Sequence, residues 1–403
     1  MEEFKEYIME ELIEEIAMGP FGSNIKVDCF VDSGVPVLNG SNLQGYKLNE
    51  TSFNYVTVEK ADSLGRANAG RGDVVITHRG TLGQIVYIPQ DSQYDRYVIS
   101  QSQFRIRLKE AKVNPAYLVN FFHTRLGLHI LLSNASQVGV PAIARPTTSF
   151  KSLKVQLPSL RFQNRVVSIL SSLDAKIELN RRINDNLEQQ AQELFDLYFD
   201  CRSEYLEGAT RGYLTDIASY LNGLAMQKFP ATDIGQSLPV LKIKELGQHK
   251  CDDSSDRCSN CIDDDYIVNN GDIIFSWSGT LLVDVWCGGK CGLNQHLFKV
   301  TPLKDYPQWF VYYWTNRHLK NFKLIAKDKA VTMGHIKRGD LEKAEVLIPT
   351  EKRMLEINAQ IAPLFQSIIG RRLEISNIEN LRDTLLPRLM SGELRISETK
   401  LGK

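Results

Sequence analysis

The stretch "VVSILSSLDAKIELNRRINDNLEQQAQELFDLYF", residues 166–199, has the spacing of one long helix in the middle of the chain. Its apolar positions advance in alternating steps of four and three residues, and Asn180 and Asn184 fall on the same stripe. This heptad spacing predicts a narrow seam that packs against a partner helix, with the asparagines fixing the register of the pair. An ordinary amphipathic helix on a globular core is the alternative that this segment alone leaves open.

A second stretch, "EINAQIAPLFQSIIGRRLEISNIENLRDTLLPRL", repeats the seam 191 residues later, at residues 356–389. Eight of its ten seam positions are apolar, and the exceptions are Arg371 and Arg382. These two arginines either meet Asn180, Asn184 or acidic residues across the seam, or extend their charged ends outward to water. Two matching seams in one chain predict that the helices pair with each other in antiparallel order.

Both helices are introduced by an extended apolar stretch, a proline and a hydroxyl residue, in "LKVQLPS" and "AEVLIPT". The hydroxyl residues Ser159 and Thr350 are expected to cap the helices. Pro363 is expected to disturb the first turns of the second helix, because proline removes one intrahelical hydrogen bond. Pro387 is expected to end or bend that helix near "SGEL".

Composition predicts a globular cytoplasmic protein of two or three domains, with 403 residues of which 43% are hydrophobic. No apolar run is long enough to cross a bilayer, and the acidic start "MEEFKEYIMEELIEE" is unlike a signal peptide. The seven cysteines are therefore expected to be reduced thiols. Because the formal net charge is zero, nucleic-acid binding would require local basic patches or a partner that adds charge.

The segments before the two helices also repeat, so the organisation is globule, helix, globule, helix. "GRGDVVITHRGTLG" (70–83) parallels "NNGDIIFSWSGTLL" (269–282), and "VPVLNGSNLQG" (35–45) parallels "LPVLKIKELGQ" (238–248), with Pro36 on Pro239. The looser matches are "LIEEIA" (12–17) with "YLTDIA" (213–218), "SQSQFRIRL" (100–108) with "LNQHLFKVT" (293–301), and "NPAYLVNFF" (114–122) with "YPQWFVYYW" (306–314).

The predicted fold class is α+β: two similar α/β domains separated by two long helices that pair as an antiparallel coiled coil. Short strands are expected at Pro36–Leu38, Asp73–Thr77, Phe104–Leu108, Pro239–Ile243, Asp272–Trp277 and Leu297–Val300. The expected boundaries are 1–155 and 204–345 for the domains, 156–203 for the central helix and 346–396 for the C-terminal helix. A helix from Val166 to Tyr198 is roughly 50 Å long, which spans on the order of 14 base pairs of DNA.

This duplicated arrangement resembles the DNA-specificity subunit of type I restriction-modification systems. The resemblance rests on "GDVVITHRGTLG", "GDIIFSWSGTLL", the entry "PSLRFQNRVVSILSSLDAKIELNRRINDNLEQQAQELF" and the closing "LRDTLLPRLMSGEL", and it extends from about residue 8 to 396. It implies two target-recognition domains that each read half of a split, asymmetric double-stranded DNA site. It also implies that the paired helices separate these domains and dock two methyltransferase subunits, which restriction subunits then join.

The sequence contains no motif that predicts catalysis or a cofactor. A GxxxxGK[ST] phosphate loop, the Asn-Pro-Pro-aromatic motif of amino-methyltransferases and a glycine-rich nucleotide turn are all missing. The chain is therefore expected to be a non-catalytic subunit. A coiled-coil adaptor that joins protein partners without reading DNA is the alternative function, although an adaptor has no need of two differently decorated domains.

Candidate DNA contacts are polar or basic residues on predicted loops, because base edges are read by such side chains and phosphates are bound by Lys and Arg. Each of them also has the ordinary interpretation of a solvated surface residue, and Trp277 that of a core residue. Arg79 and Trp277 lie at or beside equivalent places yet differ in chemistry, as expected of modules that read different half-sites. The candidates are Lys26, Asn39, Ser41, Asn42, Arg66, Arg71, His78, Arg79, Gln101 and Gln103, and then Lys228, Lys242, Lys244, Ser276, Trp277, Asn294, Gln295 and His296.

Five of the seven cysteines fall between residues 251 and 291, in the order Cys251, Cys258, Cys261, Cys287 and Cys291. Their C-x2-C and C-x3-C spacings permit a structural zinc site. Reduced thiols in a loop and a strand are the alternative, and no metal is assigned because the first domain has no equivalent cluster.

Overall fold

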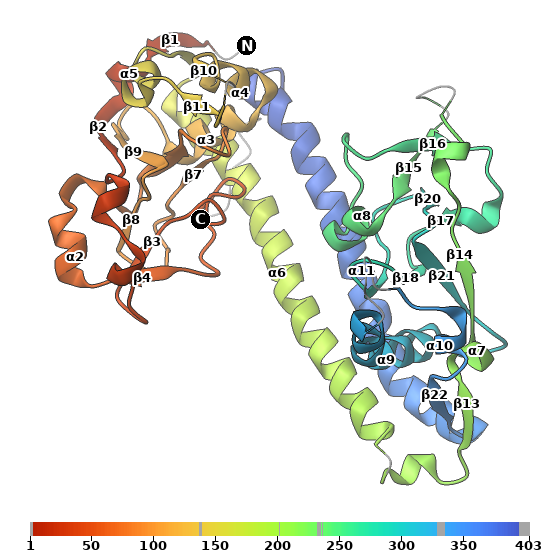
Figure 1. Ribbon diagram of the computed structural model, residues 1–403. Coiled ribbons are helices and arrows are strands. Elements are labelled where there is room, and N and C mark those ends of the chain that lie inside the picture. Colours follow the sequence, from red (N-terminus) through yellow and green to blue (C-terminus); the bar gives the residue numbers. More distant parts are fainter. Residues whose placement is uncertain are drawn as a thin grey trace. The chain divides into compact units, whose positions relative to one another are not determined.

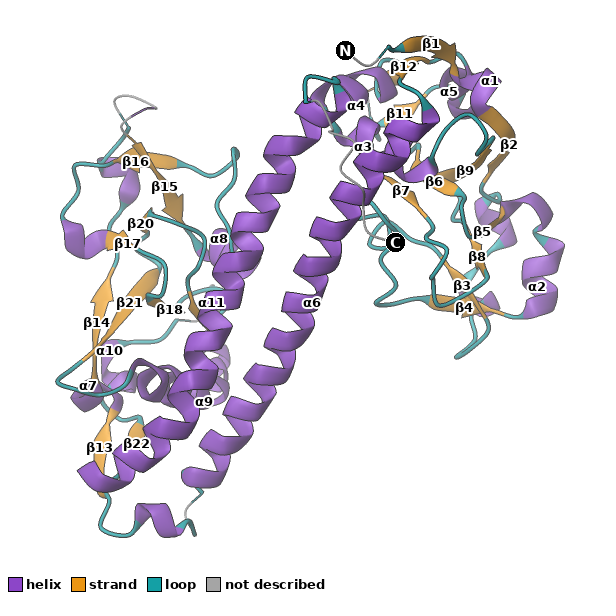
Figure 2. Cartoon of the chain, turned by 180° about the vertical axis from the view of Figure 1, so that it is seen from behind, coloured by secondary structure: helices purple, strands orange, loops and turns teal. Residues whose placement is uncertain are grey.

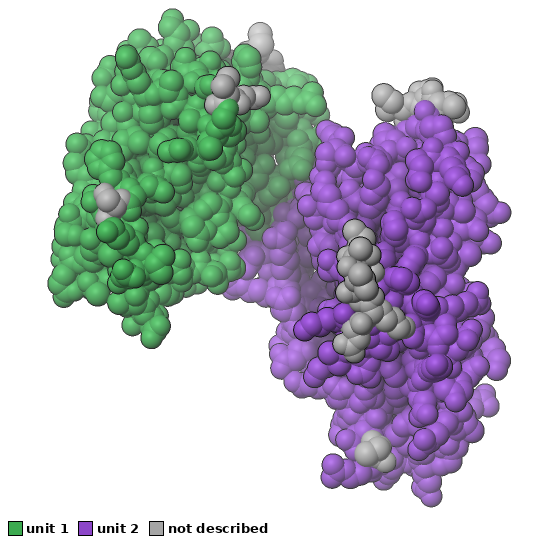
Figure 3. Space-filling model, viewed as in Figure 1, with its two compact units in different colours: residues 1–174, 381–403 green, residues 175–380 purple. Residues whose placement is uncertain are grey.

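The computed structural model describes residues 3–394 apart from 137–138, 201, 232–234, 236 and 329–334. The chain divides into two compact units, which Figure 3 shows in different colours. Unit 1 comprises Met1–Asp174 and Leu381–Lys403, and unit 2 comprises Ala175–Asn380. Each unit therefore contains one sheet-rich domain and a part of both long helices.

The two long helices predicted from the heptad seams are α6 (Leu160–Tyr198) and α11 (Glu351–Met390) (Figure 1). Ser159 Oγ accepts a hydrogen bond from the Phe162 amide at 3.4 Å, and Thr350 Oγ1 accepts one from the Arg353 amide at 3.5 Å. Both predicted caps are thus confirmed. Helix α11 continues through Pro363 and ends three residues after Pro387. The C-terminal boundary expected at residue 396 lies outside the described residues.

Contacts between α6 and α11 run in antiparallel order in unit 2, and the two helices also meet in unit 1. In unit 2, Arg181 pairs with Glu379 at 2.8 Å, and the Asn184 amide lies 3.5 Å from the carbonyl oxygen of Ile368, an earlier residue of α11. In unit 1, Asp174 accepts a hydrogen bond from Arg382 at 2.9 Å. The seam side chains of α6 are buried or half-buried: Val166, Leu170, Leu173, Ile177, Asn180, Asn184, Leu187, Ala191, Leu194 and Tyr198. The supercoil of a coiled coil remains a prediction.

The seam arginines meet polar partners rather than extending outward. Arg371 Nη1 donates to Asn180 Oδ1 at 3.0 Å, and the Asn180 amide donates to Glu374 Oε2 at 2.8 Å. Asn180 is fully buried, so these two bonds satisfy groups that would otherwise be costly to bury. The seam asparagine therefore joins α6 to α11 at one register.

Unit 1 contains two four-stranded sheets, one short antiparallel strand pair and a hairpin whose two strands are two residues long each (Figure 2). All strand pairs are antiparallel except β3 with β8. The first sheet has the order β2 (Ile13–Met18), β9 (Gln103–Leu108), β6 (Val74–Thr77) and β7 (Ile85–Tyr87). The second has the order β4 (Asn54–Val56), β3 (Val35–Val37), β8 (Arg96–Val98) and β5 (Asn68–Gly70). The pair is β1 (Lys5–Ile8) with β12 (Lys154–Leu157), and the hairpin is β10 (Ala135–Ser136) with β11 (Ala142–Ile143).

Unit 2 repeats the order of both four-stranded sheets and of the short strand pair, but its described residues contain no counterpart of the β10–β11 hairpin. Its first sheet has the order β14 (Ala218–Asn222), β21 (Leu297–Pro302), β18 (Ile273–Ser276) and β19 (Leu282–Val285). Its second has the order β16 (Arg257–Ser259), β15 (Ser237–Leu241), β20 (Cys291–Leu293) and β17 (Ile267–Val268), with β15 and β20 parallel. The short pair is β13 (Thr210–Tyr213) with β22 (Glu345–Ile348). The identical strand order confirms that the chain is duplicated, and all six predicted strands are present within two residues of their expected ends.

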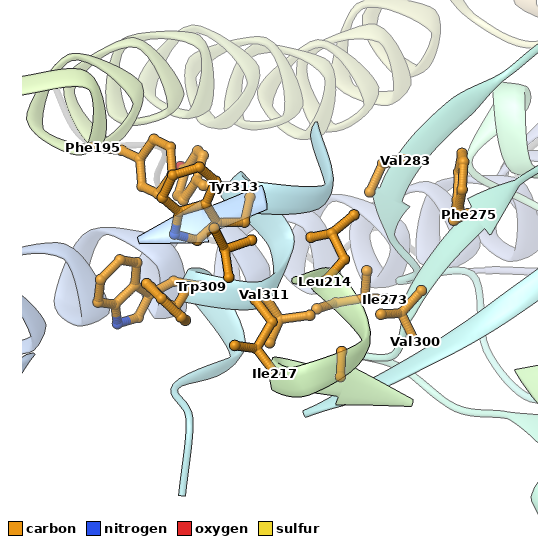
Figure 4. Packing of buried hydrophobic residues seen from close by; sticks show 14 of the residues in the cluster. Phe195, Leu214, Ile217, Ile273, Phe275, Val283, Val300, Trp309, Val311 and Tyr313 are labelled. Carbon is orange, nitrogen blue, oxygen red and sulfur yellow. The ribbon is translucent and has the colours of Figure 1, made fainter. Parts of the chain in front are cut away.

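Each domain also contains helices of its own. In unit 1 these are α1 (Met9–Leu12), α2 (Val58–Ser63), α3 (Pro115–His123), α4 (Arg125–Leu131) and α5 (Pro146–Lys151). In unit 2 they are α7 (Leu214–Ile217), α8 (Ile243–Gln248), α9 (Gln308–Asp328) and α10 (Arg338–Leu341). Figure 4 shows how α9 packs in unit 2, with Trp309, Val311 and Tyr313 in the core. The ring of Tyr313 stacks on Phe195 of α6 at a centroid distance of 5.3 Å, which attaches the helix pair to this domain.

Hydrogen-bond register corrects two of the sequence matches between the halves. Phe104 and Phe298 occupy equivalent positions because they pair with the equivalent residues Ile76 and Phe275, so residues 100–108 match 294–302 rather than 293–301. Met18 pairs with Phe104, and Asn222 pairs with Phe298. The match of 12–17 with 213–218 is therefore wrong by three residues. A bulge in β2 between Ile13 and Glu15 changes the spacing there, which residue types alone do not reveal.

Candidate nucleic-acid interface

Each domain has an open groove beside the parallel strand pair. In unit 1 the groove has a volume of about 190 Å³ and lies beside β3, with polar lining from Asn39, Asn54, Ser100 and Gln101. In unit 2 it has a volume of about 730 Å³ and lies beside β15. Its polar lining comes from Gln227, Lys242, Lys244, Asp256, Arg257, Asn294, Gln295 and His296. The structure thus gathers five of the eight candidates of the second domain around one groove.

Strand register makes the residues of the two grooves equivalent. The His78 amide donates to the Ser102 carbonyl at 2.9 Å, and the Trp277 amide donates to the His296 carbonyl at 3.4 Å. The residues before these carbonyls, Gln101 and Gln295, therefore occupy the same position in the two domains. The grooves share a glutamine at this place.

A second pair of positions differs in chemistry between the grooves. The residue after each proline pairs with an equivalent position of the parallel strand, Val37 with Val98 and Val240 with Gly292, so the two prolines are equivalent, as predicted. Their antiparallel partners, Tyr55 and Arg257, are then equivalent too. Three residues after each proline lies Asn39 in unit 1 and Lys242 in unit 2. The residue before Tyr55 is Asn54, whereas the residue before Arg257 is Asp256. Two neutral amides thus occupy the positions that an ion pair occupies in the second domain, where Lys242 Nζ bonds to the Asp256 carboxylate.

Four candidates lie inside their domains rather than on projecting loops. The Asn42 side chain accepts from the Asn39 amide and donates to the carbonyls of Asn49 and Ser52, which holds the loop after β3 together. Gln103, Ser276 and Asn294 are also buried. We therefore assign no base contact to these four.

The basic candidates differ in how far their charge is already compensated. Arg66 pairs with Glu15 at 3.1 Å, and Arg71 pairs with Asp95 at 3.0 Å. The Lys244 ammonium donates to Ser254 Oγ at 3.1 Å. Three exposed basic candidates have no ion partner among the residues that the structure describes, and these are Lys26, Arg79 and Lys228. Such side chains are suited to phosphate contacts.

His78, not Arg79, is the equivalent of Trp277. The backbone amides of His78 and Trp277 donate to the carbonyls of Ser102 and His296, which occupy equivalent positions in the two domains. Trp277 is half-buried, and its indole donates to Asn222 Oδ1 at 3.0 Å. Burial lowers the pKa of His78, whose ring also contacts the carbonyl of Gln101 at 3.1 Å. Arg79 corresponds to Ser278, since each forms an isolated bridge at the end of its strand. Of the remaining candidates, Ser41 is exposed and contacts Asn39, while His296 is exposed and its Nδ1 lies 3.0 Å from Ser278 Oγ.

Sequence reasoning missed several lining residues of the grooves. Asn54 and Arg257 begin β4 and β16, the strands that pair with β3 and β15, and Asp256 directly precedes β16; the sequence did not reveal these strands. Phe21 lies in the loop after β2 and is 83% exposed, unusual for a large aromatic side chain. Asn54, Asp256 and Arg257 are identified when the two halves are aligned by strand register instead of by residue type.

The spacing of the cysteines in the second domain permits a zinc site. Among the described residues, no group of three His, Cys, Asp or Glu side chains has the geometry to hold a metal ion. Cys251 and Cys291 contact each other, and the hydrogen bond from Cys291 lowers the pKa of the Cys251 thiol. None of the described helices combines the length and apolarity that crossing a bilayer requires.

Comparisons with known proteins agree with this architecture. The type I restriction modification DNA specificity domain matches residues 24–189. The MjaIX specificity subunit of Methanocaldococcus jannaschii is 24% identical, over 81% of this chain and 79% of that relative. The HindI specificity subunit of Haemophilus influenzae is 21% identical, over 80% of this chain and 87% of that relative.

A solved structure has the same fold. The crystal structure of the type I restriction-modification S subunit from M. genitalium is 14% identical, with a TM-score of 0.57 and coverage of 96% of both chains. Both curated relatives are specificity subunits, and the matched domain is a DNA specificity domain. Residues 24–189 thus match the type I restriction modification DNA specificity domain, and over about four-fifths of its length the chain is similar to specificity subunits of type I restriction enzymes.

Proposed function

We propose that this chain recognises a split, asymmetric double-stranded DNA site and directs the methyltransferase and restriction subunits of a type I complex to it. Residues 1–155 and 204–345 are the two target-recognition domains in this proposal. Regions 156–203 and 346–396 are the helical spacers, which also dock two methyltransferase subunits. The complex acts in the cytoplasm.

The observation that carries the proposal is the pair of equivalent grooves with different linings. The same strand order builds both grooves, so the scaffold is repeated. Asn39 and Asn54 line the first groove where Lys242 and Asp256 line the second. Side chains of these types distinguish base pairs in the major groove, so two such linings favour two different half-sites. An adaptor protein gains nothing from this difference.

The decisive experiment is to map methylated positions in DNA from cells that carry this chain together with its methyltransferase partner. We expect one motif made of two different half-sites separated by a fixed number of unspecified base pairs. The same cells without this chain provide the control. A continuous motif, a palindrome or methylation that does not depend on the chain would contradict the proposal.

A further inference from the structure

We infer that each groove reads its half-site through two elements: a glutamine that reads adenine in both, and a pair of side chains that reads different base pairs. Gln101 and Gln295 are the shared element. Lys242 with Asp256 reads a G·C pair, whereas Asn39 with Asn54 reads an A·T pair. This inference rests on the proposed function and adds base identity to it.

The shared glutamines have side chains available for contact. Gln101 is exposed, and its amide forms no side-chain hydrogen bond with the described residues. Gly22 lies directly beneath it, since a Cβ there would come 2.2 Å from Gln101 Oε1. Gln295 is half-buried, and its Nε2 lies 3.4 Å from His296 Nε2, which leaves its carbonyl oxygen free to accept. A glutamine amide bonds the N6 and N7 edge of adenine with one donor and one acceptor.

The ion pair of the second groove matches both bases of one pair. The ammonium of Lys242 can donate to O6 and N7 of guanine, and the carboxylate of Asp256 can accept from N4 of the paired cytosine. The two side chains are already in contact and are 43% and 65% exposed. Exposed ion pairs contribute little to folding stability, so the fold does not depend on this one.

The corresponding positions of the first groove carry no charge. Asn39 Oδ1 accepts from the amide of Ser41 at 2.8 Å and from its hydroxyl at 2.5 Å, which leaves the Asn39 amino group as a donor. Asn54 is exposed in the same groove and adds an acceptor oxygen. Adenine presents N7 as an acceptor and its N6 amino group as a donor in the major groove, so it requires one donor and one acceptor from the protein. Neutral amides also attract guanine less than a lysine does.

Exchange of the divergent pair between the grooves tests the inference. The full chain, assembled with its methyltransferase subunits, selects binding sites from a pool of duplexes randomised in both half-sites. For the double variant Lys242→Asn with Asp256→Asn, we expect one base pair of the second half-site to change from G·C to A·T. Relative affinity should change by about tenfold or more there, and the first half-site should stay unchanged. The reverse variant, Asn39→Lys with Asn54→Asp, should change only the first half-site.

The glutamines provide a second, independent measurement. Gln101→Ala should relax the preference for adenine at one position of the first half-site, and Gln295→Ala at one position of the second. The matched control is Arg211→Asn with Glu345→Asn, an exposed ion pair on β13 and β22 that does not line the groove. This control should leave every base preference unchanged, and thermal unfolding should show that all variants fold.

Two outcomes would overturn the inference in distinguishable ways. If the wild-type complex selects a split motif but the groove variants weaken binding equally for all sequences, the side chains contact only phosphates. The slope of the logarithm of affinity against the logarithm of salt concentration would then decrease by about one for each lost cation. If the wild-type complex selects no split motif, the proposed function itself fails, and this inference fails with it.

Discussion

The two domains attach to the long helices through an arginine of α11, but the chemistry of the attachment differs. In unit 2, Arg372 bonds to Asp284 of β19 at 2.6 Å and to Glu188 of α6 at 2.8 Å. Asp284 is buried and also accepts a hydrogen bond from His249 Nδ1 at 2.8 Å. In this unit a buried network of charges joins both helices to the sheet.

In unit 1 the attachment uses an aromatic face. The guanidinium of Arg382 lies 4.8 Å from the ring centroid of Tyr46 and donates to Asp174 of α6 at 2.9 Å. Register places Val86 of β7 where unit 2 has Asp284, because Val86 pairs with Val75 and Asp284 pairs with Ile274. Val86 is fully buried. Unit 1 therefore needs no buried counter-charge at this position.

This difference indicates that the duplicated domains kept the same backbone pairing while their contacts with the long helices diverged. A buried carboxylate is tolerated only beside a cation, so Asp284 and Arg372 depend on each other. The position 191 residues before Arg372 is Arg181, which pairs only with Glu379 and is 57% exposed. Equivalent arginines of the two helices thus have unequal roles.

The largest expected effect is on recognition, because the domains share a scaffold but not a lining. Replacing residues 1–155 by the matching domain of a related subunit should replace one half of the methylated sequence and leave the other half unchanged. Methylation mapping in cells with the methyltransferase partner measures both halves at once. A change in both halves would mean that the domains do not read independently.

The next effect concerns the buried network of unit 2. Arg372→Met leaves Asp284 with only His249 as a partner, so the free energy of unfolding should fall by about 3 kcal/mol. Urea unfolding, followed by hydrogen exchange in β18 and β19, measures the loss. The matched control Arg181→Met removes an exposed pair and should cost at most about 1 kcal/mol.

A double variant separates loss of a charge from loss of packing. Arg372→Met combined with Asp284→Val gives unit 2 the buried residue that unit 1 has at this position. Because the uncompensated carboxylate is gone, most of the lost stability should return, to within about 1 kcal/mol of wild type. A double variant as unstable as Arg372→Met would show that the arginine acts through packing alone.

The attachment of unit 1 should be weaker and independent of charge pairing with the sheet. Tyr46→Leu removes the aromatic face beneath Arg382 and should lower the free energy of unfolding by about 1 kcal/mol. Tyr46→Phe keeps the ring and should change the free energy much less. Equal losses in the two variants would assign the effect to the hydroxyl instead.

Sequence alone predicted the elements whose signal is periodic or repeated. The heptad seams gave α6 and α11, and the match of Pro36 with Pro239 gave equivalent strands, because spacing is a property of the chain itself. Burial at strand ends could not be predicted in the same way. Gln103 and Ser276 are polar and lie at strand ends next to half-buried loop residues, yet both are buried, because consecutive residues on both faces of these strands are covered.

The sequence also could not predict which residues that are far apart in the chain contact each other. Arg372 looks like a surface residue in a charged helix, and its bond to Asp284 joins positions 88 residues apart. Asn54 and Asp256 became site residues only through their pairing with β3 and β15. Such contacts depend on tertiary packing, which residue spacing does not encode locally.

The smallest expected effect is a pH dependence, above about pH 6.5, of the attachment in unit 2, because Tyr46 at the corresponding place in unit 1 does not titrate in that range. The hydrogen bond to Asp284 raises the pKa of His249, so its stabilising contribution is complete below about pH 6.5 and is lost as pH rises through the raised pKa. Since the His249 side chain is 62% exposed, the contribution should be about 0.5 kcal/mol or less. Tyr46 lies ten residues after Pro36, as His249 lies after Pro239, and burial raises its pKa above 10, so it stays neutral in this range. The difference in free energy of unfolding between wild type and His249→Gln should therefore shrink with rising pH. The difference between wild type and Tyr46→Leu should stay constant over the same range. If both differences changed with pH in the same way, the two attachments would not differ in this respect.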